Sequence, residues 1–342
     1  MKKILTLLLA LWMLTGCVAM AAENQLVVGS TTAMSGAFFT DLFGSNTADM
    51  DVRALLHGYN LMSWDNETGT YQINDSVVAG MAVSRDAQNN RVYTFDLYGD
   101  LKFSDGSAIT AKDYAFSILL TASPELAKLG GQSAAVGAIL GMDAYQSGKS
   151  SVLRGVRLLS DTQMSITISK AYEPYFYEMA LFDYSPYPIS VLAPSCKVVD
   201  TEKGVGIVNA SGTGAAIFTA GLLQKTILDA ATGYMSHPSV VSGPYTLTSY
   251  DAQRATASFA INPYYKGNED GEKPTIETIV YRKLVDETQL DQLKKGEVDV
   301  LSSLTGGDVT KAALAVVDGT NFNEVHYQRA GYGKIQFDCD FG

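Results

Sequence analysis

The sequence predicts a mixed α/β protein with more than one lobe. Helical and strand-like hydrophobic patterns alternate along the chain, and no fixed-period repeat or low-complexity segment interrupts them. The chain has 342 residues, and 326 remain once the first 16 are set aside. A chain of that length can build two or more lobes, each with its own hydrophobic core.

The first 17 residues predict export from the cytoplasm. Lys2 and Lys3 precede an apolar run over residues 4–14, which is too short to cross a bilayer of roughly 30 Å. The run ends in Leu-Thr-Gly-Cys, which resembles a bacterial lipobox. We therefore expect a signal peptide over 1–16, lipid attachment at Cys17 and a lipidated tether over 17–23. The alternative is an ordinary secretory signal cut at Ala19 or Ala22, with Cys17 discarded.

Composition excludes several classes of function. The formal charge is −11 and becomes −13 without Lys2 and Lys3, so phosphate-rich nucleic acid and anionic lipid surfaces would be repelled. Membrane contact is therefore expected through the N-terminal lipid alone. Past residue 17 only Cys196 and Cys339 remain, and their spacing does not show whether they pair. We expect no metal and no cofactor, because the histidines are isolated and Cys-x-x-Cys is absent.

The N-terminal half shows clear element signals. Residues 25–29 are typical of a buried strand, and residues 51–61 place apolar side chains at helical spacing. Between them, residues 30–46 carry almost no charge and are rich in Ser, Thr, Gly and Phe, which suits either a plain loop or a ligand contact. Residues 92–97 alternate as a strand, and residues 101 and 103 resume that alternation. Thr110 and Asp113 then predict a capping box that opens a helix.

The remaining chain follows the same alternation. Ser123 and Pro124 are typical of a helix start. We expect strands over 157–159, 164–168, 278–284 and 298–301, two antiparallel strands within 239–260, and a helix over 287–296 that ends at Gly296. The glycine pairs at 204–206 and 212–214 lack the helix of a phosphate cradle and are expected to be loops.

Several blocks, in order, resemble the extracellular solute-binding proteins of family five, the peptide-, dipeptide- and nickel-binding receptors of ABC importers. The blocks are residues 92–97 (VYTFDL), 101–106 (LKFSDG), 109–117 (ITAKDYAFS), 141–145 (GMDAY), 242–245 (SGPY), 262–267 (NPYYKG) and 290–300 (LDQLKKGEVDV). Any one block is a weak signal, but the shared order is specific. Physically these blocks are scaffold, since Asp105 and Asp113 serve a turn and a cap.

The resemblance implies a periplasmic-binding-protein-like fold of type II, cluster C, with two lobes and an extra N-terminal subdomain. It implies domain I over residues 24–55 and 170–282, an inserted subdomain over 56–169, and the start of domain II over 283–342. Family members are longer, so the second lobe is expected to be incomplete. Residues 17–342 expressed alone are then expected to be poorly soluble or loosely packed.

The resemblance also implies a function. We expect a monomeric, lipid-anchored, extracytoplasmic receptor that captures oligopeptides or dipeptides and delivers them to the permease subunits of an ABC importer. Alternatives are another solute (a nickel chelate, haem or an oligosaccharide) or a truncated product without function. A secreted hydrolase is disfavoured, because no Gly-x-Ser-x-Gly occurs and no histidine has an evident nucleophile partner, so no catalytic residue is assigned. The predicted ligand contacts lie after the first strand: Thr32, Met34, Ser35, Phe38 and Phe39, with Tyr184 and Tyr187 as weaker candidates.

Overall fold

The computed structural model describes residues 24–44, 46–65, 67–132, 137–304 and 306–326. The predicted signal peptide, the tether, Cys17 and Cys339 lie outside the described residues. The chain forms two compact units, residues 1–301 and 302–342. Within its described part the second unit contains helix α9 (Gly307–Leu314). The fold and the sites below belong to the first unit.

Five strands form the sheet that positions the candidate site, and we call it sheet A. In spatial order they are β11 (Tyr245–Asp251), β12 (Thr256–Ile261), β13 (Thr278–Lys283), β1 (Gln25–Ser30) and β14 (Val300–Leu301). β11, β12 and β13 are antiparallel neighbours, whereas β1 runs parallel to both β13 and β14. The register pairs Gln25 with Thr278 and Val28 with Val300. The carboxyl ends of β13, β1 and β14 therefore meet at one edge of the sheet.

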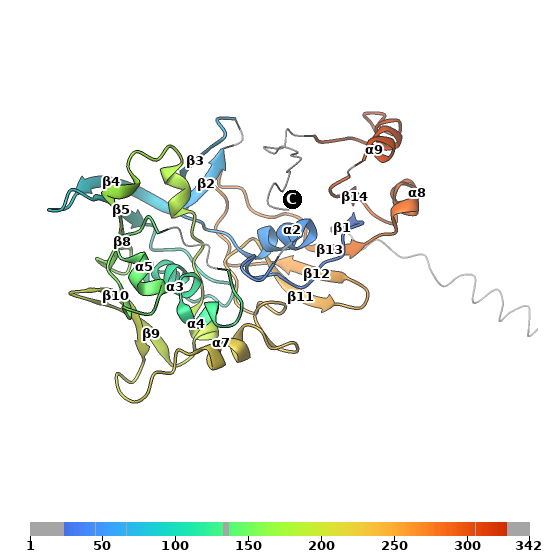
Figure 1. The fold of residues 1–342 in the computed structure, drawn as a ribbon. Coiled ribbons are helices and arrows are strands. Elements are labelled where there is room, and N and C mark those ends of the chain that lie inside the picture. The colour runs from blue at the N-terminus through green and yellow to red at the C-terminus, as the bar shows by residue number, and fades with distance from the viewer. Residues whose placement is uncertain (1–23, 45, 66, 133–136, 305, 327–342) are drawn as a thin grey trace, which may run out of the picture. The chain divides into compact units, whose positions relative to one another are not determined.

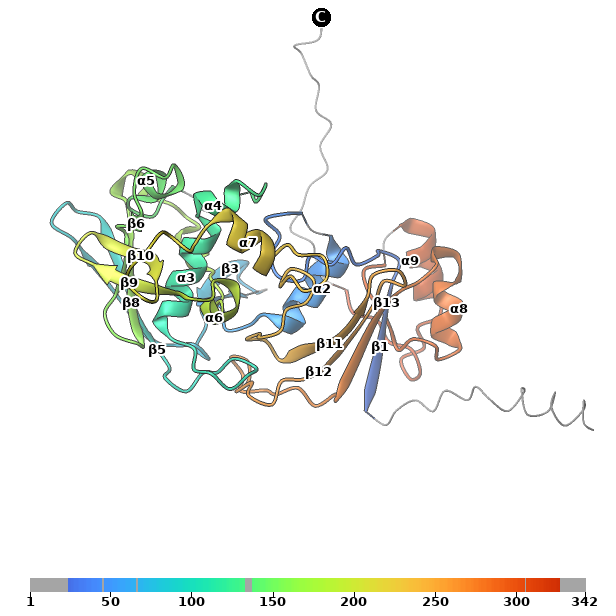
Figure 2. The same ribbon diagram turned by 90° about the horizontal axis from the view of Figure 1, so that it is seen from below.

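Helices α2 (Thr47–Leu56) and α8 (Gln289–Lys294) lie on opposite faces of sheet A (Figure 2). Two adjacent residues of β13 show this, because successive side chains of a strand point to opposite faces. The Tyr281 hydroxyl donates to the Asp51 carboxylate of α2 at 2.8 Å. The Arg282 guanidinium donates to the Glu297 carbonyl, just past α8, at 2.7 Å.

Among its described residues, the rest of the first unit contains three smaller sheets (Figure 1). The four-stranded sheet has the order β4 (Val78–Arg85), β5 (Arg91–Leu97), β8 (Gln163–Ile168) and β7 (Val156–Leu158). The three-stranded sheet has the order β6 (Val152–Leu153), β10 (Gly204–Asn209) and β9 (Cys196–Thr201). The hairpin consists of β2 (Met62–Asp65) and β3 (Thr70–Ile73).

Helix α3 (Ala111–Thr121) is the most buried helix of this part, with nine buried residues from Ala111 to Leu120. The predicted capping box is confirmed, since the Asp113 carboxylate accepts from the Thr110 N–H at 2.8 Å and from its hydroxyl at 2.9 Å. The shorter helices are α4 (Pro124–Ala127), α5 (Met142–Gln146), α6 (Ile189–Leu192) and α7 (Ala220–Thr226), with 3₁₀ turns η1 (Lys170–Tyr172), η2 (Glu178–Phe182) and η3 (Asp286–Thr288).

Two hydrophobic clusters build the core of the first unit. One contains α2 and the strands of sheet A, with Phe38, Val52 and Phe259 fully buried. The other joins residues 37–168 to residues 181–235, because β6 pairs with β10 and Phe182 packs on Tyr93 and Phe95. Residues 283–301 pack on sheet A through β14, which explains why the compact unit extends beyond residue 282. The domain assignment made from the sequence stays a prediction.

Most elements predicted from the sequence are confirmed, and three differ: one helix, one strand and one loop. The helix expected over 51–61 begins at Thr47 and ends at Leu56, because Asn46 caps it and Tyr59 adopts a positive φ of 59°. Residues 101 and 103 form no strand and flank an isolated bridge between Lys102 and Ala108. The prediction of a loop at residues 204–206 is wrong, because this segment is part of a strand. It is the start of β10, where glycine lets the backbone of residues 151–154 approach to 2.4–2.9 Å from a would-be Cβ.

Candidate ligand-binding edge of sheet A

The carboxyl edge of sheet A has the topology at which α/β proteins bind ligands. β1 leads to α2 on one face, and β13 leads to α8 on the other. The chain connections therefore separate at the carboxyl ends of β1 and β13, and such a switch point leaves a crevice outside the strand ends. The Leu284 N–H donates to the Ser30 carbonyl at 2.8 Å, which holds the two ends together.

The segment after β1 is held by a row of polar side chains along α2. Asn46, Asp49, Arg53 and His57 follow one another at intervals of three and four residues, so they share one face of the helix. Each contacts the backbone of residues 33–38. We call this row the α2 polar row.

The first half of the α2 polar row fixes residues 33–36. The Asn46 side chain donates to the Ala33 carbonyl at 2.9 Å and also accepts from the Asp49 N–H as the helix N-cap. The Asp49 carboxylate is 0% exposed. It accepts from the Ser35 N–H at 2.8 Å, the Ser35 hydroxyl at 2.6 Å and the Gly36 N–H at 3.3 Å. A buried carboxylate is tolerated when it is hydrogen-bonded in this way.

The second half fixes residues 37–38. The Arg53 guanidinium donates to the Ala37 carbonyl at 2.8 Å, and the His57 Nε2 lies 2.9 Å from the Phe38 carbonyl oxygen. A carbonyl only accepts, so Nε2 carries the proton. Burial lowers the pKa of His57 to about 4, and the nearby Arg53 charge acts in the same direction. At neutral pH this ring is therefore uncharged and works as a structural donor.

The structure places the five predicted contact residues on one continuous segment with different exposure. Ser35 is exposed and Thr32 is half-buried, whereas Met34, Phe38 and Phe39 are buried. Phe38 packs edge-to-face on Tyr250 at 4.7 Å between ring centroids, and Phe39 packs on Tyr187 at 4.6 Å. The three apolar side chains thus anchor the segment in both hydrophobic clusters. Whether any of the five contacts a ligand stays a prediction.

The weaker candidates Tyr184 and Tyr187 are half-buried side chains of the larger cluster. Burial raises the pKa of Tyr184 to about 12 and that of Tyr187 still further. The Tyr187 ring contacts Phe39 directly, so it belongs to the support of the segment after β1.

The α2 polar row was not identified from the sequence, although its signal is present. Polar residues at positions 46, 49, 53 and 57 recur at helical spacing, beside the apolar positions 48, 52 and 56. This spacing predicts a helix face whose polar side chains can form hydrogen bonds with a neighbouring segment. It does not show that the partners are the backbone groups of residues 33–38.

Other kinds of site find little support. Among the described residues no group of three or more His, Cys, Asp or Glu side chains is arranged to hold a metal ion. Within the same residues no helix has both the length and the apolar character to cross a membrane. Cys196 is a buried free thiol.

Comparison with known proteins supports the family suggested by the sequence blocks. Residues 76–340, more than half of the chain, match the bacterial extracellular solute-binding proteins, family 5 middle. The chain belongs to this family. Family 5 proteins are solute-binding receptors with a two-lobe periplasmic-binding-protein fold, so the predicted fold class is confirmed.

Two curated relatives illustrate the similarity. The periplasmic oligopeptide-binding protein OppA of Escherichia coli (strain K12) is 33% identical over 111 residues, which is 32% of this chain and 20% of the relative. The dipeptide-binding protein of Lactococcus lactis subsp. cremoris (strain MG1363) is 29% identical over 162 residues, which is 46% of this chain and 28% of the relative. The matched segments span a minority of these longer proteins.

Solved structures share the fold at low identity. Lactococcal OppA, complexed with an endogenous peptide in the closed conformation, superposes with a TM-score of 0.62 at 18% identity and covers 86% of this chain and 48% of its own. Haemophilus influenzae OppA, in complex with the peptide RPPGFSPFR, gives a TM-score of 0.57 at 17% identity, covering 86% and 49%. The chain therefore spans about half the length of the solved proteins it matches.

Proposed function

We propose that this chain is the solute receptor of a bacterial ABC importer and that it binds peptides at the carboxyl edge of sheet A. The proposal includes an extracytoplasmic location, a lipid anchor at Cys17, delivery to permease subunits and a monomeric receptor that catalyses no reaction. It is supported by family membership and by relatives named for oligopeptide and dipeptide binding.

The observation that supports a peptide as the ligand is a set of backbone groups without hydrogen-bond partners. Within the described part of the chain, the Thr31 N–H and carbonyl, the Thr32 carbonyl and the Ala33 N–H make no hydrogen bond. Neighbouring groups are occupied, because the Thr32 N–H donates to the Ser30 hydroxyl and the Ala33 carbonyl accepts from Asn46. A short extended segment with free donors and acceptors is what an added peptide strand pairs with.

Main-chain pairing suits a receptor for varied peptides, because it reads the backbone that all peptides share. In this proposal the α2 polar row holds residues 33–38 rigid, so that little conformational entropy is lost when a peptide docks. Thr32 and Ser35 face the ligand. The buried side chains of Met34, Phe38 and Phe39 hold the segment in the hydrophobic core.

N-methylated peptides test this proposal without altering the protein. Calorimetry of the full chain with tri- to pentapeptides should detect binding that tolerates side-chain changes. N-methylation at the positions that pair with residues 31–33 should weaken binding by at least about tenfold, since each lost pair leaves a buried group unsatisfied. The matched control is the same peptide methylated one residue along, which directs the methyl group away from the segment. Equal affinity for both methylated forms would contradict the proposal.

A further inference from the structure

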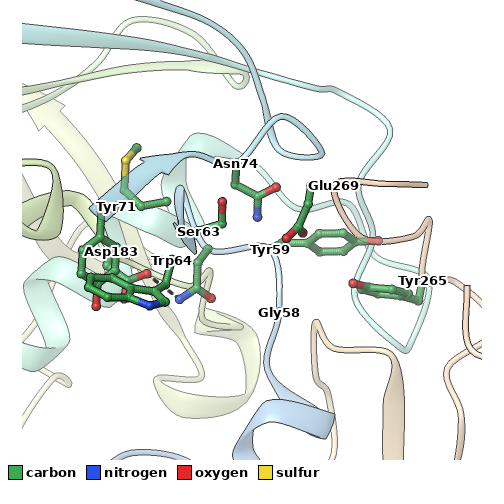
Figure 3. Close-up of a pocket in the computed structure, with 11 residues that line it drawn as sticks. Gly58, Tyr59, Ser63, Trp64, Tyr71, Asn74, Asp183, Tyr265 and Glu269 are labelled. Carbon is green, nitrogen blue, oxygen red and sulfur yellow. Dashed lines mark hydrogen bonds between the residues drawn. The ribbon is translucent and has the colours of Figure 1, made fainter. Parts of the chain in front are cut away.

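A separate pocket lies beyond the C-terminal end of α2. It has a volume of about 320 Å³, near the lower end of the range for small-ligand sites. Its walls come from the segment after α2, the β2–β3 hairpin, residue 183 and the loop after β12 (Figure 3). α2 has ten residues, about 15 Å of helix, and its N-terminal end adjoins the segment after β1. The pocket is therefore distinct from the carboxyl edge of sheet A.

One end of the pocket combines an aromatic pair with a carboxylate. Trp64 and Tyr71 lie edge-to-face at 5.2 Å between centroids and an angle of 73°, and Trp64 is 45% exposed. Asp183 lies beside them in Figure 3. Its Oδ1 accepts from the Asn60 side chain at 2.7 Å, and within the described residues it forms no ion pair. Burial raises the pKa of Asp183, and the hydrogen bond from Asn60 acts in the opposite direction.

The other end repeats the combination. Tyr59 and Tyr265 are stacked at 5.1 Å with an angle of 21°, and Glu269 lies beside them in Figure 3. Among the described residues no hydrogen bond or ion pair involves the Glu269 carboxylate. The neighbouring Lys266 ammonium is held elsewhere, 2.9 Å from Asp100 and over the Tyr98 ring.

A buried amide also points into the pocket. Asn74 is 7% exposed, and its Oδ1 accepts from the Ser76 N–H and hydroxyl. Its Nδ2 faces the pocket in Figure 3 and has no hydrogen-bond partner in the described part of the chain. This amide is a hydrogen-bond donor, and the lining offers acceptors of two kinds, the Ser63 hydroxyl and the carboxylates of Asp183 and Glu269. No Lys, Arg or His is among the described residues that line the pocket.

We propose that this pocket binds an aliphatic diammonium compound, with one ammonium at Asp183 and the other at Glu269. Two carboxylates that form no ion pair within the described residues attract positive charge, and each aromatic pair offers a ring face to an ammonium group. The methylene chain between the ammonium groups would lie along the aromatic walls. This site is independent of the proposed peptide site and requires no peptide.

Calorimetry of the full chain with 1,4-diaminobutane, 1,5-diaminopentane, n-butylamine and 1,4-butanediol tests the proposal. We expect a diamine to bind, n-butylamine to bind at least about tenfold more weakly, and the diol not to bind. Asp183→Asn and Glu269→Gln should each weaken diamine binding at least about tenfold and reduce the difference between diamine and monoamine. Glu202→Gln removes an equal charge from an exposed turn outside the pocket and should leave the affinity unchanged.

Other results would overturn the proposal. These are no diamine binding by the unaltered chain, equal binding of diamine and monoamine, binding of the diol as tight as that of the diamine, or an equal loss in the Glu202→Gln variant. Melting temperatures keep the test interpretable. The Glu269 carboxylate makes no hydrogen bond to any residue that the structure describes, and the amide oxygen introduced by Asp183→Asn can still accept from Asn60. Both pocket variants should therefore melt as the unaltered chain does.

Discussion

His57 shows how one residue connects pH to the geometry of the candidate site. Its neutral ring donates to the Phe38 carbonyl, and its ring also packs against Phe39 at 5.8 Å between centroids. Protonation would place a charge in a buried position beside Arg53, which explains the lowered pKa of about 4. The segment after β1 therefore depends on a histidine that stays uncharged.

Acidification should weaken folding through this residue. An unfolded histidine titrates near 6.5, so between that pH and about 4 the unfolded chain binds more protons and stability falls. The expected loss between pH 7 and pH 5 is about 2 kcal/mol. Denaturant titrations of the unaltered chain and of His57→Gln at both pH values measure it. Glutamine can donate to Phe38 without titrating, so the variant should lose less stability.

The comparison between the two proteins isolates the effect of His57. Asp113 affects stability in the opposite direction. Burial raises its pKa to about 6, so the folded chain binds a proton there before the unfolded chain does, and acidification stabilises the fold through this residue. Asp113 is present in both proteins, so its effect cancels in the comparison. Parallel stability curves for His57→Gln and the unaltered chain would show that His57 does not carry the effect.

At the scale of elements, α2 connects the candidate edge to sheet A by close backbone contact. Gly243 precedes β11, and its N–H donates to the Leu56 carbonyl at 2.8 Å. A Cβ at position 243 would lie 2.5 Å from the Leu56 carbonyl carbon and 2.6 Å from the Leu55 oxygen. Glycine is needed here for approach, since rigid backbone cannot give way as a side chain can.

Gly243→Ala should therefore destabilise the first unit. Overpacking against fixed backbone costs about 1–3 kcal/mol, and separation of α2 from β11 would also loosen residues 33–38. Denaturant unfolding measures the loss. Gly221→Ala is the matched control, because α7 leaves open space around that position and alanine favours a helix. A Gly243→Ala variant as stable as Gly221→Ala would refute the close-contact argument.

Elements with local signals could be predicted from the sequence, and contacts set by tertiary packing could not. The alternation around Tyr93 and the Thr110–Asp113 pair are local, and both are confirmed. The strand at 204–209 has two glycines and forms only because β6 and β9 flank it, so its sequence resembled a loop. Phe38 and Phe39 were predicted as ligand contacts from the family resemblance, and that call stays a prediction. Their packing partners Tyr250 and Tyr187 lie far along the chain, so these contacts could not be predicted from local sequence.

At the scale of the whole molecule, membrane attachment should depend on a single atom, the Cys17 sulfur. The formal charge of −11 repels anionic lipid, and the part of the chain that the structure describes has no membrane-spanning helix. Acyl chains would supply the binding instead, at about 0.8 kcal/mol for each buried methylene group, and two or more chains are needed for stable anchoring.

Fatty-acid labelling and intact-mass measurement of the exported protein test this anchor. The processed chain should begin at Cys17 and carry the mass of its acyl groups, and Cys17→Ser should remove the label completely. Cys196→Ser is the matched control, because that thiol is buried and should not react with a lipid donor. A processed chain that begins after Ala19 or Ala22 without a label would contradict the anchor.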